Sequence, residues 1–180
     1  MTGSESGPRT VAAEDLRACM RRFPTGVALL TTGEGDGAVG LTINSVVSVS
    51  LSPPALLVSV HRHARITERL VPGADFSVSF LSAGQADLTW QFASADRPVG
   101  EAAVSAMGRA KGSNGVPFPV GALGVLECVV EKTVPVGDHV LVIGLVARAE
   151  PGPADHLPQV FHRGELTTVN RAAHPVDAKV

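Results

Sequence analysis

The 180-residue sequence has few charged residues, 18% in all, and no basic excess. Its formal net charge is −2 at pH 7, so nucleic acid is not an expected partner. No apolar run reaches membrane-spanning length without an interrupting Ser, Asn or Pro. The first ten residues, MTGSESGPRT, have no apolar signal core. We therefore expect a cytoplasmic protein that binds no nucleic acid and no membrane.

Cysteine is scarce and tyrosine is absent. Cys19 and Cys128 lack the spacing of a redox or zinc motif, so we expect two reduced, buried thiols. Hydrophobic residues make up 44% of the chain, which excludes wholesale disorder. So few charges on a domain of this size also suggest that some surface is hidden in an oligomer.

The hydrophobic pattern predicts mostly strands joined by hairpins. A helix with one apolar stripe (Leu16, Cys19, Met20, Phe23) is expected before Pro24. Strands are expected at 27–32, 40–52, 55–60 and 75–81, as a long pair within 121–150 turning at Gly137-Asp138, and as a short pair within 159–169. Short helices are expected near 66–71 and 82–92, and a long loop at 96–118.

Because hairpins dominate, an antiparallel barrel is favoured over a doubly wound sheet. We expect one domain at residues 13–170 between flexible tails at 1–12 and 171–180. Gly35, Gly37 and Gly40 match the glycine pattern of dinucleotide-binding loops. That pattern should open a helix, but a β-branched, Ser-rich segment follows it, so Asp36-Gly37 indicates an ordinary hairpin.

The segment GLTINSVVSVSLSPP (40–54) alternates hydroxyl or amide side chains with aliphatic ones. In a strand this pattern gives one apolar face and one polar face. No residue from 37 to 60 is charged, although solvent-facing strands usually carry several charged side chains. Two interpretations remain open here: a water-facing sheet rich in Ser and Thr, or a face covered by a planar, polar molecule that short side chains allow to approach.

The segment SVHRHARIT (59–67) has the chemistry of an anion site. Arg65 is a forked donor, and Thr67 is a candidate N-cap for a helix whose free N–H groups would face an anion. The alternative is an ordinary capped surface helix. His61 and His63 would face the same way on a strand, but no third ligand is evident, so no metal is expected. The sequence contains no hydrolase or metalloprotease motif either.

Five segments taken together are informative: RRFPTGVALLTT (21–32), GLTINSVVSVSLSPPALLVSV (40–60), WQFASADR (90–97), VGDHVLVIGLV (136–146) and FHRGEL (161–166). In this order the chain resembles the short-chain flavin reductases, the reductase components of two-component flavin-dependent monooxygenases. The resemblance runs from about residue 14 to residue 169.

The resemblance implies an FMN-binding split β-barrel, antiparallel and of Greek-key type, that works as a homodimer with flavin near the subunit interface. It implies an oxidoreductase that moves a hydride from NADH or NADPH to N5 of free FAD or FMN and supplies reduced flavin to a separate monooxygenase. The alternatives are a tightly FMN-bound oxidase of the pyridoxamine-phosphate-oxidase type and a non-catalytic flavin-binding module on the same barrel.

The resemblance also implies site residues. Those expected at the flavin are Thr42, Ile43, Asn44, Ser45, Ser48, Ser50, Leu51, Ser59, Val60, His61, Arg65, Thr67, Phe92, Ala93, Ser94 and Arg97. Those expected at the nicotinamide are His139, His162, Arg163 and Gly164. His162 is the candidate for positioning the nicotinamide, although a histidine in a tight turn is often structural. The chain departs from the common pattern at Ile43, Val46-Val47, Ser52 and Phe161, which leaves FMN against FAD open.

Overall fold

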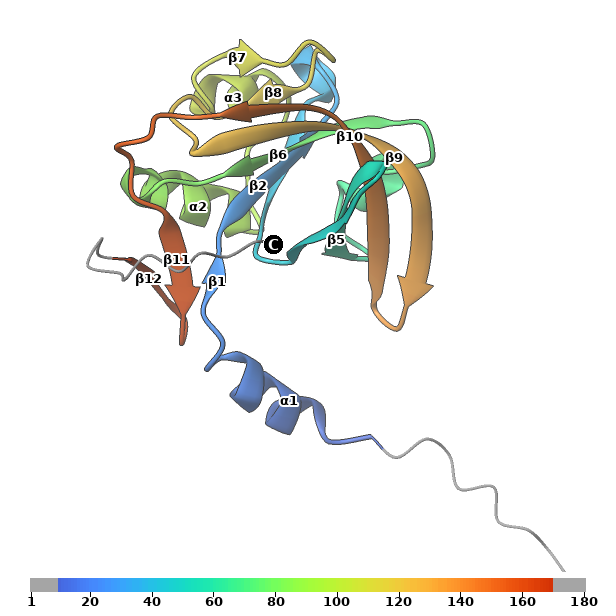
Figure 1. The fold of residues 1–180 in the computed structure, drawn as a ribbon, viewed down its shortest axis with the longest axis vertical. Coiled ribbons are helices and arrows are strands. Elements are labelled where there is room, and N and C mark those ends of the chain that lie inside the picture. Colours follow the sequence, from blue (N-terminus) through green and yellow to red (C-terminus); the bar gives the residue numbers. More distant parts are fainter. Residues whose placement is uncertain (1–9, 170–180) are drawn as a thin grey trace, which may run out of the picture.

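Antiparallel strands form most of the computed structural model, which describes residues 10–169 (Figure 1). Seven strands pair in the order β3-β2-β6-β9-β10-β5-β4. Their bounds are β2 (Ala28–Thr32), β3 (Val39–Ile43), β4 (Val46–Leu51), β5 (Pro54–His61), β6 (Asp75–Phe80), β9 (Gly124–Val136) and β10 (His139–Pro151). The expected mainly β, antiparallel class is confirmed.

The seven-stranded sheet curls because its two edge strands are neighbours in sequence. β3 lies at one edge and β4 at the other, and only Asn44 and Ser45 connect them. A two-residue connection requires the edges to approach each other, as in a barrel that is split along one seam. Asn44 and Ser45 therefore lie at the seam.

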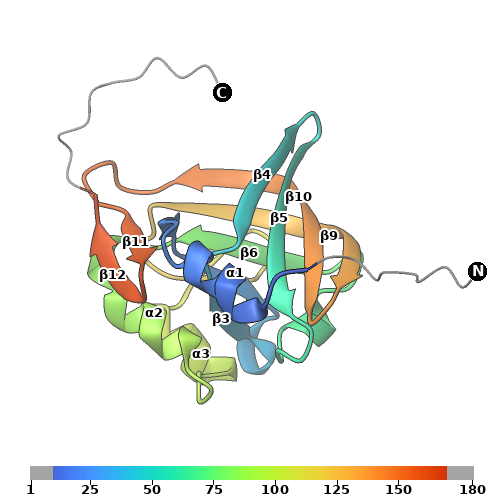
Figure 2. The same cartoon turned by 90° about the horizontal axis from the view of Figure 1, so that it is seen from below.

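Smaller elements flank the barrel (Figures 1 and 2). A three-stranded sheet has the order β1-β11-β12, and β7 pairs with β8. The bounds are β1 (Thr25–Gly26), β7 (Ala110–Lys111), β8 (Pro117–Phe118), β11 (Gln159–His162), β12 (Glu165–Thr168), α1 (Ala13–Met20), α2 (Ala86–Ala93) and α3 (Gly100–Ala106). Three short 3₁₀ helices are η1 (Gly35–Gly37), η2 (Thr67–Arg69) and η3 (Ala83–Gln85).

Two apolar clusters hold these elements together. The larger fills the barrel, with Phe76, Val58 and Val142 fully buried. The smaller lies between the sheet and helices α2 and α3, around Leu29 and Phe92. A Cβ on Gly40 would lie 2.7 Å from two ring carbons of Phe92, so the missing side chain lets α2 approach β3 closely.

Several expected features are confirmed. β9 and β10 form the long hairpin around Gly137-Asp138. β11 and β12 turn at Arg163-Gly164, where φ is +55° and +93°. Ser82 and Gln85 form the expected capping box. η1 joins β2 to β3 as a hairpin, so the glycine pattern opens no dinucleotide-binding helix.

Other expectations are wrong. The strand expected at 40–52 is two strands, because the chain crosses from one sheet edge to the other at Asn44. The loop expected at 96–118 contains α3 and the β7–β8 pair. The helix expected near 66–71 is only η2, and Ile66 rather than Thr67 is its N-cap. The Thr67 hydroxyl instead donates to the carbonyl of His61 at 2.9 Å.

The N-terminal helix differs most from its expected packing. α1 has no buried residue, and its stripe is open: Leu16 is 56% exposed and Phe23 is 63% exposed. Cys19 is exposed as well, so only Cys128 is the buried thiol that was expected. Burial raises the pKa of the Cys128 thiol to about 12, with help from the nearby Glu127 carboxylate.

Nothing in residues 10–169 forms a helix with the length and hydrophobicity needed to span a membrane. The expected tails at 1–12 and 171–180 lie mostly outside the described residues.

Candidate functional site

Three cavities meet at Asn44, on the seam of the barrel. One lies beside α2, one between the barrel and α1, and one between α1 and the β11–β12 turn, and Asn44 lines all three. The Asn44 side chain is exposed, and its amide has no hydrogen-bond partner within residues 10–169. A free amide offers both a donor and an acceptor to a ligand.

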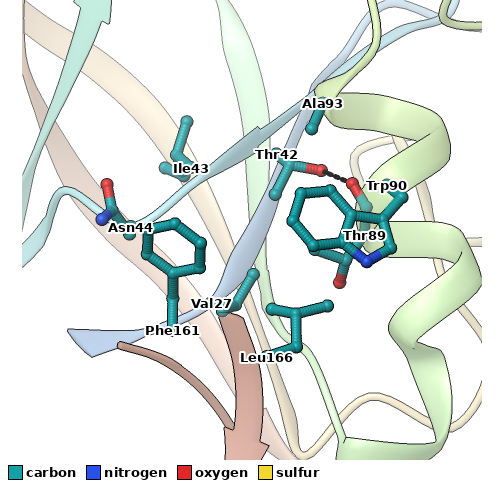
Figure 3. Close-up of a pocket in the computed structure, with 9 residues that line it drawn as sticks. All are labelled: Val27, Thr42, Ile43, Asn44, Thr89, Trp90, Ala93, Phe161 and Leu166. Atoms are coloured by element: carbon teal, nitrogen blue, oxygen red, sulfur yellow. Dashed lines mark hydrogen bonds between the residues drawn. The ribbon is translucent and has the colours of Figure 1, made fainter. Parts of the chain in front are cut away.

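The cavity beside α2 has a volume of about 180 Å³ and no charged residue in its lining. Thr42, Ile43 and Asn44 form one side of it, and Trp90 and Phe161 lie on either side of the space (Figure 3). The remaining lining residues are Val27, Thr89, Ala93 and Leu166. An uncharged cavity with aromatic walls suits a flat, mostly apolar ring.

The cavity between α1 and the barrel is the largest of the three, at about 790 Å³. Asn44, Ser45 and Ser48 supply polar groups, while Met20 and Phe23 approach from the end of α1. The lining again contains no Lys, Arg, Asp or Glu. Within the uncharged stretch noted in the sequence, residues 44–48 therefore line a large cavity.

Hydroxyl groups fix the walls of these cavities. The Thr42 hydroxyl donates to the carbonyl of Thr89 at 2.8 Å, which joins β3 to α2. The Ser45 hydroxyl donates to the carbonyl of Ser59 at 2.8 Å and accepts its N–H at 3.2 Å, which joins the seam to β5. The buried Thr89 hydroxyl also donates to Gln159. Asn44 therefore lies between two residues, Thr42 and Ser45, whose side chains are fixed by hydrogen bonds.

Arg65 and Arg97 both donate to backbone carbonyls in the segment that follows the C-terminal end of α2. The Arg65 guanidinium donates to the carbonyls of Ala95 at 3.2 Å and Arg97 at 3.3 Å, and Arg97 donates to the carbonyl of Ser94 at 2.8 Å. Burial and the charge of Arg65 lower the pKa of the Arg97 guanidinium. Neither guanidinium pairs with a carboxylate inside the described part of the chain. Two neighbouring guanidiniums without a carboxylate partner favour an anion.

Three imidazoles gather at the C-terminal end of β5. The ring centre of His61 lies 5.6 Å from that of His63 and 5.4 Å from that of His139. His139 also contacts Asp138 at 2.7 Å, which lowers the pKa of that carboxyl through hydrogen bonding and charge. No group of three or more potential ligands in residues 10–169 has the arrangement of a metal site.

The structure does not bring all the expected site residues together. Phe92 and Val60 are buried in the core, so a ligand cannot reach their side chains from outside. Leu51 lies on the exposed strand β4, while the Ser50 hydroxyl accepts the N–H of Ser52. His139 lies on the β9–β10 hairpin, far from the β11–β12 turn that carries His162, Arg163 and Gly164 (Figures 1 and 2).

Sequence reasoning missed five residues that line the cavity beside α2: Val27, Thr89, Trp90, Phe161 and Leu166. Trp90 is 52% exposed although tryptophan usually packs inside. It lies within WQFASADR, but a helical tryptophan next to core residues gives no signal that separates a ligand wall from a core position. Only the approach of β11 and β12 to α2 reveals the cavity.

Comparison with known proteins identifies the family. The model of the flavin reductase like domain matches residues 20–170. The chain belongs to the flavin reductase-like family. Among relatives, it is 39% identical over 155 residues to an NADH-dependent FMN reductase of Streptomyces nodosus subsp. asukaensis, covering 86% of this chain and 84% of the relative. It is 39% identical over 140 residues to an NADH-dependent FAD reductase of Streptomyces globisporus, covering 77% and 76%.

Solved structures agree with this assignment. The flavin reductase component of a bacterial two-component tryptophan halogenase superposes with a TM-score of 0.79 at 32% identity, covering 88% of this chain and 98% of that one. The Streptomyces globisporus NADH:FAD oxidoreductase in complex with NAD and FAD fragments superposes with a TM-score of 0.78 at 32% identity, covering 93% and 100%. The barrel of this flavin reductase-like chain is thus the split barrel that the sequence predicted.

Proposed function

We propose that the protein is an NADH-dependent flavin reductase that reduces free FMN or FAD and supplies the reduced flavin to a separate monooxygenase. The observation that carries the proposal is the convergence of uncharged cavities on the free amide of Asn44. The similarity to NADH-dependent FMN and FAD reductases favours this function over a tightly FMN-bound oxidase or a non-catalytic module.

In this proposal the flavin ring lies along the seam. The amide of Asn44 pairs with the donor–acceptor edge of the ring, and Thr42, Ile43 and Ser45 form its bed. Ser48, Ser50 and Leu51 continue along the ribityl chain, and Ala93 and Ser94 border the ring from the end of α2. Phe92 and Val60 do not contact the flavin in this proposal; their buried side chains pack in the core and stabilise the positions of β3 and β5. The cavity beside α2 and the cavity between the barrel and α1 share Asn44, and their volumes of about 180 Å³ and 790 Å³ together leave room for a tricyclic ring.

The flavin phosphate binds at Arg65 and Arg97 in the same proposal. Both guanidiniums keep donors free beyond their bonds to backbone carbonyls. In the proposal Ser59, His61 and Thr67 also belong to this site, and the Thr67 hydroxyl holds the turn after β5 by donating to the carbonyl of His61. These groups give a phosphorylated flavin an advantage over riboflavin.

The nicotinamide binds beside the β11–β12 turn, with His162 as the positioning residue and Arg163 and Gly164 beside it. Positive φ at both turn residues keeps the tip of the hairpin tight. His139 reaches this ligand only from a second copy of the chain, because the two hairpins of one copy lie apart.

The reaction needs no nucleophile from the protein. The C4–H bond of the dihydronicotinamide breaks, its hydrogen and both electrons form the N5–H bond of the flavin, one negative charge passes to the flavin, and the nicotinamide is left positive. The protein's residues bind, orient and stack the two substrates at contact distance. An uncharged, hydroxyl-lined cavity binds flavin modestly, which allows the reduced product to leave.

A homodimer completes the proposal. The apolar stripe of α1 and the aliphatic side chains of β4 are open in one copy, with Val49 53% and Leu51 79% exposed. Both surfaces border the largest cavity, so a second copy that covers them would also close it. We place the protein in the cytoplasm, where its two unpaired cysteines stay reduced.

A steady-state assay tests the function. The purified protein is mixed with NADH or NADPH and with FMN, FAD or riboflavin, and absorbance at the nicotinamide band is followed. We expect oxidation of NADH that requires added flavin and rises with its concentration. A protein that retains tight FMN and ignores added flavin would instead be the oxidase, and absence of any flavin-dependent oxidation would indicate a binding module.

A further inference from the structure

Three arginines surround the third cavity at Asn44. This cavity has a volume of about 150 Å³ and lies between α1 and the β11–β12 turn. Arg17 lies on α1, Arg21 follows the end of that helix, and Arg163 lies in the β11–β12 turn; all three line the cavity. Its other lining residues are Met20, Phe23, Thr25, Asn44 and Phe161, so no carboxylate faces it.

The backbone holds the arginines in this arrangement. The N–H of Arg163 donates to the carbonyl of Arg21 at 3.1 Å, which ties the turn to the end of α1. A Cβ on Gly164 would lie 3.1 Å from Nη2 of Arg21, so that guanidinium lies against the turn. The bond between the two segments involves main-chain atoms only, which leaves the guanidiniums available to a ligand.

The cluster is electrostatically uncompensated. None of Arg17, Arg21 and Arg163 pairs with an acidic side chain among the residues the structure describes. Three like charges around one small cavity repel one another and create a positive potential there. An anion with several oxygens relieves that repulsion, and guanidinium forks match phosphate oxygens in pairs.

We propose that this cavity binds the diphosphate of NADH. The inference rests on the proposed function, which gives the protein two anionic substrates. Arg65 and Arg97 serve the flavin phosphate, so the second arginine cluster is left for the nicotinamide dinucleotide. Phe161 and Asn44 line both this cavity and the one beside α2, so a diphosphate here places an attached nicotinamide within reach of the seam.

The kinetic test separates the diphosphate from the rest of the molecule. Arg17→Gln and Arg21→Gln are assayed with NADH and with 1-benzyl-1,4-dihydronicotinamide, which carries no phosphate, with riboflavin as acceptor. We expect each substitution to raise the KM for NADH on the order of ten-fold and to leave the benzyl analogue unchanged. Arg22→Gln is the matched control, since Arg22 is adjacent and exposed but lines none of the three cavities.

A second arm tests the other phosphate source. If the cavity binds the flavin phosphate, the two variants will raise the KM for FMN but not for riboflavin and will leave the KM for NADH unchanged, which would overturn the proposal. The wild-type chain gives a further check without any substitution. Its KM for NADH should rise with ionic strength more steeply than its KM for the benzyl analogue, and equal salt dependence would count against the site.

Direct binding distinguishes failure of this proposal from failure of the proposed function. ADP-ribose is titrated calorimetrically into the full chain and into Arg21→Gln. Weaker binding by the variant supports the site even if the protein oxidises no NADH. An active reductase whose Arg17→Gln and Arg21→Gln variants bind ADP-ribose as tightly as the wild type would refute the site and leave the function standing.

Discussion

Among single residues, Arg65 makes the proposed flavin phosphate site testable. Its guanidinium has no carboxylate partner in residues 10–169, donates to the backbone carbonyl of Arg97, and through its charge lowers the pKa of the Arg97 guanidinium. Arg65→Gln should raise the KM for FMN about ten-fold or more, because charge-assisted hydrogen bonds contribute about 1.5–3 kcal/mol. The KM for riboflavin should not change. Arg69→Gln is the control, since Arg69 likewise donates to a backbone carbonyl, that of Gly37. Equal effects on both flavins would contradict the assignment.

His162 tests the nicotinamide side. The residue ends β11, next to the tight Arg163-Gly164 turn. His162→Ala should raise the KM for NADH several-fold and change kcat little, because a positioning contact made equally in ground state and transition state affects binding alone. Steady-state kinetics at saturating flavin measures this. His156→Ala, on an exposed loop histidine that contacts the carbonyl of Gly121, is the control. An unchanged KM would assign His162 to the turn alone.

The sequence predicted some of these residues better than others, for physical reasons. Asn44 was expected at the flavin because it lies in GLTINSVVSVSLSPPALLVSV, one of the segments that carry the family resemblance. Trp90 was not, because a tryptophan beside buried Phe92 on a helix looks like core until the facing strands are known. Thr67 was wrongly taken as an N-cap, since its hydroxyl can equally bond a preceding carbonyl, here that of His61.

At the scale of elements, β9 holds the loop before β8 through Glu127. This buried carboxylate accepts the Ser113 hydroxyl at 2.6 Å and the Asn114 N–H at 3.1 Å, and Arg148 lies 3.7 Å away. Burial raises the pKa of Glu127, but these hydrogen bonds and the Arg148 charge outweigh it and leave the pKa below its usual value. The carboxylate therefore stabilises the fold above the unfolded-state pKa, about 4.3, and that stability is lost as pH falls through the lower folded-state value.

Glu127→Gln should consequently lower the free energy of unfolding at pH 7 by about 1–3 kcal/mol. It should also flatten the decrease in stability between about pH 5 and pH 3. Urea unfolding at several pH values measures both effects. Glu131→Gln, at an exposed position on the same strand, controls for the loss of a charge. A variant with the same acid slope as the wild type would show that Glu127 does not supply this dependence.

Hairpin strands were predictable because their turns are marked by Gly137-Asp138 and Arg163-Gly164. The division of 40–52 was missed, although the alternation breaks where two polar residues, Asn44-Ser45, are followed by two apolar ones, Val46-Val47, and the pairing partner changes there from β2 to β5. That break marks the end of one strand, but it does not show which strands pair on either side, because pairing is a tertiary event. The stripe on α1 was read correctly as apolar, but no residue of α1 is buried within residues 10–169.

For the whole molecule, the open stripe of α1 and the open strand β4 predict a dimer. Val49→Glu should convert the dimer to a monomer and reduce flavin-dependent NADH oxidation together, because a charge in an apolar interface is costly. Sedimentation and the activity assay measure the two effects. Val71→Glu is matched for exposure, as both valines are 53% exposed. A wild-type monomer with full activity would contradict the prediction.

A crystal structure of the protein with FMN tests the central claim most directly. The account predicts the isoalloxazine ring at the seam, where the cavity beside α2 meets the cavity between the barrel and α1, within hydrogen-bond distance of the Asn44 amide, and the phosphate at Arg65 and Arg97. A ring bound elsewhere, with Asn44 and Ser45 left in contact with solvent, would contradict it.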